Sequence, residues 1–130
     1  MLAFSIACSV KAQTLYTVNS GNYYYYPQSV TINVGDTVRW VNDGGFHNVN
    51  FDINAITGVS YNNPESFISV PTNNTDMYTH VFTIPGNYDY DCSVGTHAAN
   101  GMVGSVIVNS ASSTIFVSSK NKVIESRYNI

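Results

Sequence analysis

The sequence predicts an all-β fold in which antiparallel strands form a sandwich or a barrel. The chain of 130 residues contains ten Tyr and is also rich in Val and Thr. Charged residues make up only 10% of it. Aromatic and β-branched residues of this kind are enriched in strands. They occur in short runs separated by Gly, Pro and Asn, which is typical of antiparallel sheets rather than of βαβ units. The length fits one domain with a hydrophobic core.

The first part of the chain contains five expected strands, each followed by a turn signal. In one of them Val30, Ile32 and Val34 alternate, so that one face is apolar. We expect Trp40 to lie in the core, and the run Tyr23–Tyr26 to alternate between core and surface, with Tyr26, before Pro27, packing inward. The five expected strands cover residues 14–18, 23–27, 29–34, 37–42 and 46–51.

Three more strands are expected after an irregular segment at 52–76, in which Asn63 and Pro64 are suited to start one helical turn. On a strand of period two, Cys92 shares one face with Tyr88 and Tyr90 and points toward the core, whereas Asp89 and Asp91 share the other face. We expect that acidic face to be solvated. We also expect Met77 to pack inside and His80 to face solvent. The three strands cover residues 77–84, 88–92 and 102–109.

The two ends of the chain differ in composition from the part between them. Residues 1–12 are a short apolar run ending in Val10-Lys11-Ala12, which is typical of a secretory signal. We therefore expect a signal-peptide remnant at 1–12, a domain at 13–109 and a tail or linker at 110–130. The tail has three open interpretations: a linker, an extra strand at 114–117, or the start of a sorting segment. No stretch is apolar for long enough to span a membrane as a helix.

The net charge and the cysteines of the chain limit the classes of function that it can have. The formal net charge is −3, and an acidic chain lacks the basic surface that nucleic-acid binding requires. Of two cysteines, Cys8 lies in the leader, in a context that matches a lipid-attachment box poorly. Cys92 is then the only cysteine of an exported protein, where a free thiol is liable to oxidation. Copper ligation, nucleophilic catalysis and simple burial are the three explanations for it.

The segment DCSVGTHAANGM, residues 91–102, carries Cys92, His97 and Met102 at intervals of five residues. Two imidazoles, one thiolate and a weak axial thioether form a copper site that suits both Cu(I) and Cu(II). The second imidazole must come from His47 or His80. We favour His47, because it follows two flexible glycines at the head of an expected strand. Three histidines are too few for a second copper centre, which argues against multicopper oxidases and nitrite reductases.

Two stretches carry a family resemblance. The sequences YPQSVTINVGDTVRWVNDGGFHNV and IPGNYDYDCSVGTHAANGMVGSVIVN resemble the cupredoxin family, the small blue copper proteins of plastocyanin and pseudoazurin type. The resemblance covers residues 14–109. The Cys-x4-His-x4-Met spacing is more similar to that of phytocyanins, but phytocyanins carry a disulfide and no cysteines remain here to form one.

The resemblance implies a Greek-key β-sandwich of about eight strands with one copper ion, cycling between Cu(I) and Cu(II), at one end. By matching position, the implied ligands are His47, Cys92, His97 and Met102, and Asn48 is implied to hold the segment of His47 against the ligand loop by hydrogen bonds. His97 is implied to be the partly exposed edge at which electrons enter and leave.

The expected function is therefore that of an exported type-1 copper protein, periplasmic or extracellular. It transfers single electrons between transient redox partners, acts as a monomer, and has no substrate chemistry. Asp91 stands where many plastocyanins have an aromatic residue, so no electron route through this position is implied. The alternatives are a periplasmic copper carrier, an appended domain of a surface protein, and a metal-free adhesion domain.

Overall fold

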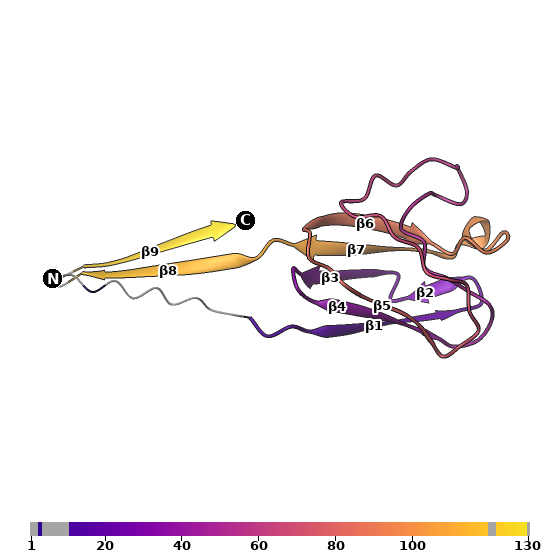
Figure 1. The fold of residues 1–130 in the computed structure, drawn as a ribbon, viewed down its shortest axis with the longest axis horizontal. Coiled ribbons are helices and arrows are strands. Elements are labelled where there is room, and N and C mark those ends of the chain that lie inside the picture. The colour runs from indigo at the N-terminus through magenta and orange to yellow at the C-terminus, as the bar shows by residue number, and fades with distance from the viewer. Residues whose placement is uncertain (1–2, 4–10, 120–121, 130) are drawn as a thin grey trace. The chain divides into compact units, whose positions relative to one another are not determined.

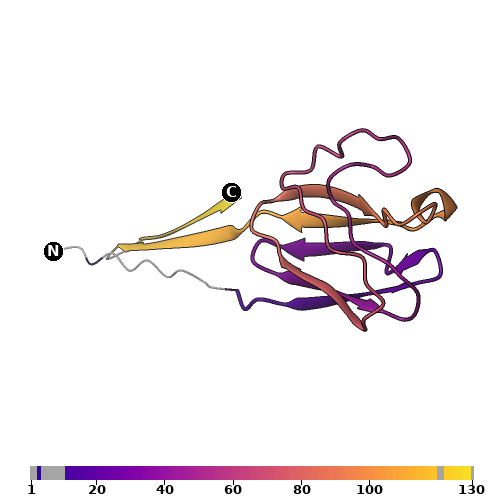
Figure 2. The ribbon, with the colours of Figure 1, turned by 45° about the vertical axis from the view of Figure 1, so that its right-hand side comes forward.

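A computed structural model describes residue 3 and residues 11–119 and 122–129. Residues Gln13–Asn109 form one compact unit, in which seven strands make two facing sheets (Figures 1 and 2). The only helical element of the described residues is the 3-10 turn η1 (Ala98–Asn100). The expected all-β sandwich is therefore confirmed. No helix in the described ranges is long and apolar enough to cross a membrane.

The first sheet has four strands and is mixed rather than purely antiparallel. β1 runs antiparallel to β2 but parallel to β4, with Leu15 opposite Thr37, and β4 is antiparallel to β5. The parallel pair arises because β3, which lies between β2 and β4 in the chain, belongs to the other sheet. The strands are β1 (Leu15–Gly21), β2 (Tyr24–Tyr26), β4 (Thr37–Asn42) and β5 (Asp76–Val81).

The second sheet has three strands, β3 (Ser29–Asn33), β7 (Val103–Asn109) and β6 (Gly86–Asp91), in the order β3-β7-β6. β3 is parallel to β7, with Ser29 opposite Ser105, and β6 is antiparallel to β7. The alternating side chains predicted on β3 do face inward, since Val30 and Ile32 are buried. Strand β6 ends one residue before Cys92. The chain therefore passes directly from this strand into the loop that carries Cys92, His97 and Met102.

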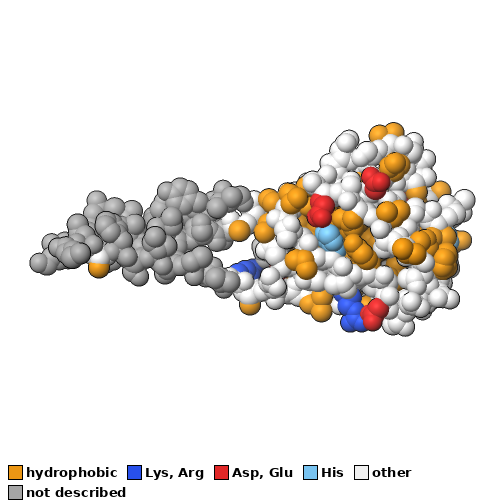
Figure 3. Space-filling model, viewed as in Figure 1, with side chains coloured by type: hydrophobic (Ala, Val, Ile, Leu, Met, Phe, Trp, Pro, Cys, Tyr) orange, Lys and Arg blue, Asp and Glu red, His pale blue; other side chains and the backbone are white. Residues whose placement is uncertain are grey.

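The core between the sheets is rich in aromatic rings. Trp40 and Met77 are buried as expected, and Trp40 donates a hydrogen bond from Nε1 to the hydroxyl of Tyr90, at 3.2 Å. Phe51 stacks on Tyr90 with 4.6 Å between ring centroids. On the outside, Figure 3 shows hydrophobic side chains in patches among uncharged polar and backbone atoms, and charged groups are few, in keeping with the low charge content.

Two expected elements are absent. The expected strand at 46–51 forms only isolated bridges, from His47 to Thr72 and from Asn50 to both Ile68 and Asp91. Of these partners only Asp91, the last residue of β6, belongs to a regular strand, so no continuous ladder forms. No helical turn forms at residues 63–66, where only residues 64 and 65 make a bend.

Three predicted orientations are wrong. Tyr26 is 74% exposed and Tyr25 is buried instead, because the tight turn at Tyr23, whose φ is +63°, shifts the alternation by one residue. Asp91 is fully buried, since the segment after β4 covers its face of β6. His80 does not face solvent freely: its ring stacks on Phe67 at 3.9 Å between centroids.

A second, separate unit contains the C-terminal residues. β8 (Ser112–Ser119) and β9 (Lys122–Asn129) pair antiparallel, with Ser112 opposite Asn129. β8 includes the stretch 114–117 that is one of the three interpretations of the tail. The expected leader with Cys8 lies almost entirely outside the described residues.

Candidate metal centre

Three candidate ligands from two distant segments meet in space. His47 follows β4, whereas Cys92 directly follows β6 and His97 directly precedes η1. The Nδ1 atom of His97 lies 3.4 Å from the Sγ atom of Cys92 and 3.2 Å from Nδ1 of His47. Sγ of Cys92 and Nδ1 of His47 are 3.9 Å apart. All three donor atoms thus lie within 4.8 Å of one another.

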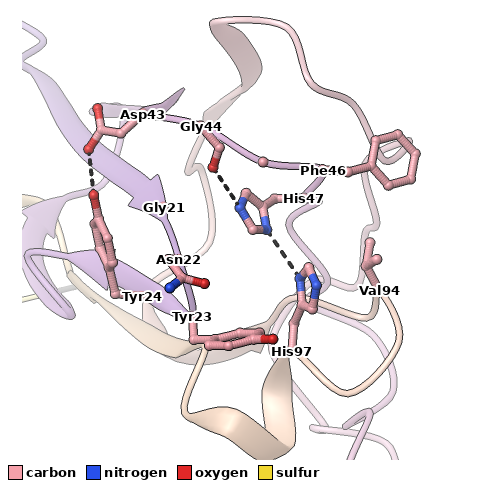
Figure 4. A pocket seen from close by; sticks show the side chains of 11 residues that line it. Gly21, Asn22, Tyr23, Tyr24, Asp43, Gly44, Phe46, His47, Val94 and His97 are labelled. Atoms are coloured by element: carbon pink, nitrogen blue, oxygen red, sulfur yellow. Dashed lines mark hydrogen bonds between the residues drawn. The ribbon is translucent and has the colours of Figure 1, made fainter.

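A backbone carbonyl fixes the orientation of the His47 ring. Nε2 of His47 is 2.9 Å from the carbonyl oxygen of Gly44, as the dashed line in Figure 4 shows. A carbonyl only accepts, so Nε2 carries the hydrogen and Nδ1 keeps its lone pair, directed at His97. Burial lowers the pKa of His47, an effect that the Gly44 hydrogen bond opposes and nearby His97 reinforces. The ring is therefore neutral and ready to act as a donor to a metal.

Gly45 leaves the space that the His47 ring occupies. Its φ is +103°, a region that side chains disfavour, and a Cβ placed on it would lie 2.5 Å from Nε2 of His47. The pair Gly44-Gly45 thus supplies both the carbonyl and the room for the imidazole.

Cys92 is the only free cysteine in the described part of the chain, and it is completely buried. Burial raises the pKa of its thiol above the usual value, and the backbone groups of Asn48 and Val94 offset this effect only in part. The metal-free thiol is therefore stabilised in its protonated form, and a metal ion, which binds the thiolate, would displace the proton.

The loop from Cys92 to Met102 is closed by its own backbone. The carbonyl of His97 accepts from the N–H of Met102 at 3.1 Å, and the carbonyl of Met102 accepts from the N–H of Cys92 at 3.1 Å. Gly101, with φ +103°, makes the turn between them. Met102 is fully buried, and these bonds keep it beside both other residues of the loop.

Asn48 joins the two segments that carry the candidate ligands. Its Oδ1 accepts from the N–H of Ser93 at 2.8 Å, and its Nδ2 donates to the hydroxyl of Ser93 at 2.8 Å and to the carbonyl of Ser69 at 3.3 Å. The side chain is 1% exposed. It is in direct contact with the residue after Cys92, so it restrains the position of the sulfur.

His97 is the candidate ligand nearest to solvent. His47 and Cys92 are buried, whereas His97 is partly exposed and lines a pocket of about 580 Å³ together with Tyr23, Phe46 and Val94 (Figure 4). The ring of Tyr23 meets that of His97 edge to face, at 5.3 Å and 77°. Sequence reasoning missed Tyr23, because only the positive φ of the turn turns its ring toward the site.

The donor set suits copper. Two imidazole nitrogens and one thiolate sulfur converge, with a buried thioether residue closing the same loop. Of the two histidines considered for the second nitrogen, it is His47 that approaches Cys92. His80 lies elsewhere, with Nε2 at 3.1 Å from a carboxylate oxygen of Glu65.

Comparisons with known proteins point the same way. Residues 12–109 match the model of the family described as copper binding proteins, plastocyanin/azurin family. The chain is 37% identical to the chloroplastic plastocyanin of Tetradesmus obliquus over 110 residues, covering 81% of this chain and 72% of that one. It is 34% identical to the plastocyanin of Synechococcus sp. (strain JA-2-3B'a(2-13)), covering 83% of each chain.

Among solved structures, amicyanin from Paracoccus versutus is similar at 30% identity and a TM-score of 0.52, covering 77% of this chain and 85% of that one. A copper-containing nitrite reductase from Thermus scotoductus SA-01 has a TM-score of 0.60 and 26% identity, but this chain spans only 22% of it. These matches confirm the resemblance, the copper cofactor and the expected function of a blue copper electron-transfer protein. The chain belongs to the plastocyanin/azurin family of copper-binding proteins.

Proposed function

We propose that His47, Cys92 and His97 hold one copper ion, with Met102 as a weak axial ligand, and that the protein passes single electrons between redox partners. The observation that carries this proposal is the convergence of the three donor atoms within 4.8 Å of one another. When bound, copper supplies a reversible one-electron couple.

The chain's part in this function is to hold its donors still. The Gly44 carbonyl orients the His47 ring, and Asn48 keeps that segment against Ser93, next to the thiolate. Hydrogen bonds around metal-binding side chains orient them and tune the metal. A site restrained in this way changes little in geometry when its charge changes by one, which favours rapid electron exchange.

Electrons pass through the edge of His97 in this proposal. His97 is the partly exposed candidate ligand, while Cys92 and Met102 have no exposed surface. A partner therefore approaches the site from the pocket side, where Phe46 is 53% exposed. The protein acts as a carrier without substrate chemistry, and its complexes with partners are transient.

The domain boundaries and the location belong to the same proposal. Residues 13–109 carry the function, residues 1–12 direct export, and residues 110–130 form a tail. We propose a monomer in the periplasm or outside the cell.

Copper titration of the chain from residue 13 onward tests the function. Cu(II) should produce an intense blue band that a reductant bleaches and an oxidant restores. Cys92→Ser should abolish the band, whereas the matched variant His80→Ala should keep it, because His80 lies outside the site. If the protein takes up Cu(I) alone and shows no reversible couple, it is a copper carrier and the proposal fails.

A further inference from the structure

Asp91, the residue before Cys92, is a fully buried carboxylate. Its Oδ1 accepts a hydrogen bond from Nδ2 of Asn50 at 2.7 Å. Its Oδ2 accepts from the backbone N–H of Ala55 at 2.7 Å and from the hydroxyl of Tyr61 at 2.6 Å. All three partners are donors, which is the arrangement that an ionised carboxylate requires when it is removed from water.

The three donors belong to one segment, residues 50–61. The backbones of Asn50 and Asp91 also bond to each other in both directions, at 2.9 and 3.0 Å. In Figures 1 and 2 this part of the chain forms the long loop that arches beyond β6, on the side away from the first sheet. Asp91 is therefore a point at which the arch is fastened to the strand that leads to Cys92, beside the bonds that Asn63 makes to the backbone of Asp89.

The position of this fastening matters for the metal centre. Asn50 lies three residues after His47, and Asp91 lies one residue before Cys92. The Asp91–Asn50 contacts thus join the two segments that carry the candidate ligands, on the face of β6 opposite to the sulfur. Together with the Asn48–Ser93 bonds they hold the two segments from both sides of Cys92.

The charge of Asp91 is not balanced by a cation in any ion pair of the described residues. Its partners are an amide, a peptide N–H and a phenol, all neutral. A negative charge in the protein interior acts on nearby charges far more strongly than one in water. It stabilises the more highly charged oxidation state of a metal ion held by the neighbouring thiolate.

We propose that Asp91 is a positioning residue of the metal centre, whose buried carboxylate fastens segment 50–61 to the ligand strand and favours the oxidised form of the bound metal. This inference rests on the proposed function, because it concerns the same copper couple.

The test compares Asp91→Asn with Asp89→Asn in the copper-loaded protein and in the metal-free protein. Asp89 lies on the same strand and loses the same charge, but it is exposed. Voltammetry should show a higher reduction potential for Asp91→Asn, equivalent to roughly a tenfold loss or more in the preference for Cu(II) over Cu(I). Asp89→Asn should shift the potential much less. Equal shifts in the two variants would overturn the role of the buried charge.

Amide hydrogen exchange in the metal-free protein tests the fastening separately. The N–H of Ala55 should exchange about tenfold faster or more in Asp91→Asn than in Asp89→Asn, because its acceptor is altered. If Asp91→Asn does not fold, Tyr61→Phe removes one hydrogen bond and keeps the charge. It should also speed exchange at Ala55, and an unchanged rate would contradict the fastening. A wild-type protein without a blue copper couple would refute the proposed function, whereas this exchange measurement would still report on Asp91.

Discussion

The Nδ1 atom of His47 lies 3.9 Å from the Sγ atom of Cys92, although 45 positions separate the two residues in the chain. The contact exists because the segment after β4 is bonded to the end of β6, through the backbones of Asn50 and Asp91 and through the side chain of Asn48. The donor atoms are thus brought together by bonds between two segments that lie far apart in the chain. Binding of copper to the folded chain stabilises it further by mass action.

Gly45→Ala should damage both the fold and the site. The added Cβ meets the imidazole of His47 at 2.5 Å, and the φ of +103° is strained for alanine. We expect a loss of about 1–3 kcal/mol in the free energy of unfolding of the metal-free protein, and a weaker blue band. The matched control is Gly58→Ala, where φ is also positive but no atom lies within 4 Å. Urea unfolding measures the free energy of unfolding of both variants, and visible spectra measure their blue bands. If Gly58→Ala loses as much as Gly45→Ala in both quantities, the contact with His47 is unimportant.

Asn48→Ala should lower stability by about 1–3 kcal/mol, because it leaves the buried carbonyl of Ser69 and the partly buried N–H of Ser93 without this partner. The melting temperature of the metal-free protein measures this loss. Copper affinity should fall by about 10-fold or more, since residues that orient ligands affect the metal by this amount. Asn74→Ala, at an exposed position, should change neither quantity. An Asn48→Ala protein with unchanged affinity would show that the sulfur is positioned without it.

Tyr23→Ala should release copper to a chelator faster than the wild type does. The edge-to-face contact with His97 is lost, and such contacts contribute about 0.5–1.5 kcal/mol. This corresponds to a rate increase of roughly two- to tenfold. Tyr23→Phe keeps the ring and should release copper at the wild-type rate. Faster release from the Phe variant as well would assign the effect to the hydroxyl instead of the ring contact.

The stability of the metal-free protein should decrease above about pH 10. Burial, and then the hydrogen bond to Asp91, raises the pKa of Tyr61, and burial followed by the charge of Glu65 raises that of Tyr88. Above pH 10 the unfolded chain loses these protons while the folded chain keeps them, so the free energy of unfolding falls as pH rises. Urea unfolding at pH 8.5–11 should show this slope, and the double variant Tyr61→Phe, Tyr88→Phe should reduce it. An equal slope in both proteins would contradict the assignment.

The sequence was sufficient for the elements that depend on local pattern. The limits expected for β4 are those observed, because alternation and the flanking turn signals coincide there. The residues of the ligand segment could also be named in advance, since few residue types donate to copper. Their roles as ligands remain predictions.

Features that depend on the packing of distant segments could not be predicted from the sequence. A period of two separates Asp91 from Cys92 onto opposite faces, but it does not reveal that segment 50–61 covers the second face. Likewise, nothing in the run of tyrosines indicates that the turn at Tyr23 places Tyr25 inside and leaves Tyr26 outside. The functional importance of Gly44-Gly45 becomes visible only when the His47 ring is seen beside them.

The parallel pairing of β3 with β7 also sets the order in which the molecule can be assembled. Ser29 and Ser105 share a hydrogen bond across 76 positions of sequence, and β6 is held in its sheet by β7 alone. Contacts of such long range slow folding into the millisecond-to-second range. During synthesis on the ribosome, the strand that leads to Cys92 has no neighbour in its sheet until residues 103–109 have emerged. The proposed metal site is therefore complete only after residues 103–109 have been translated.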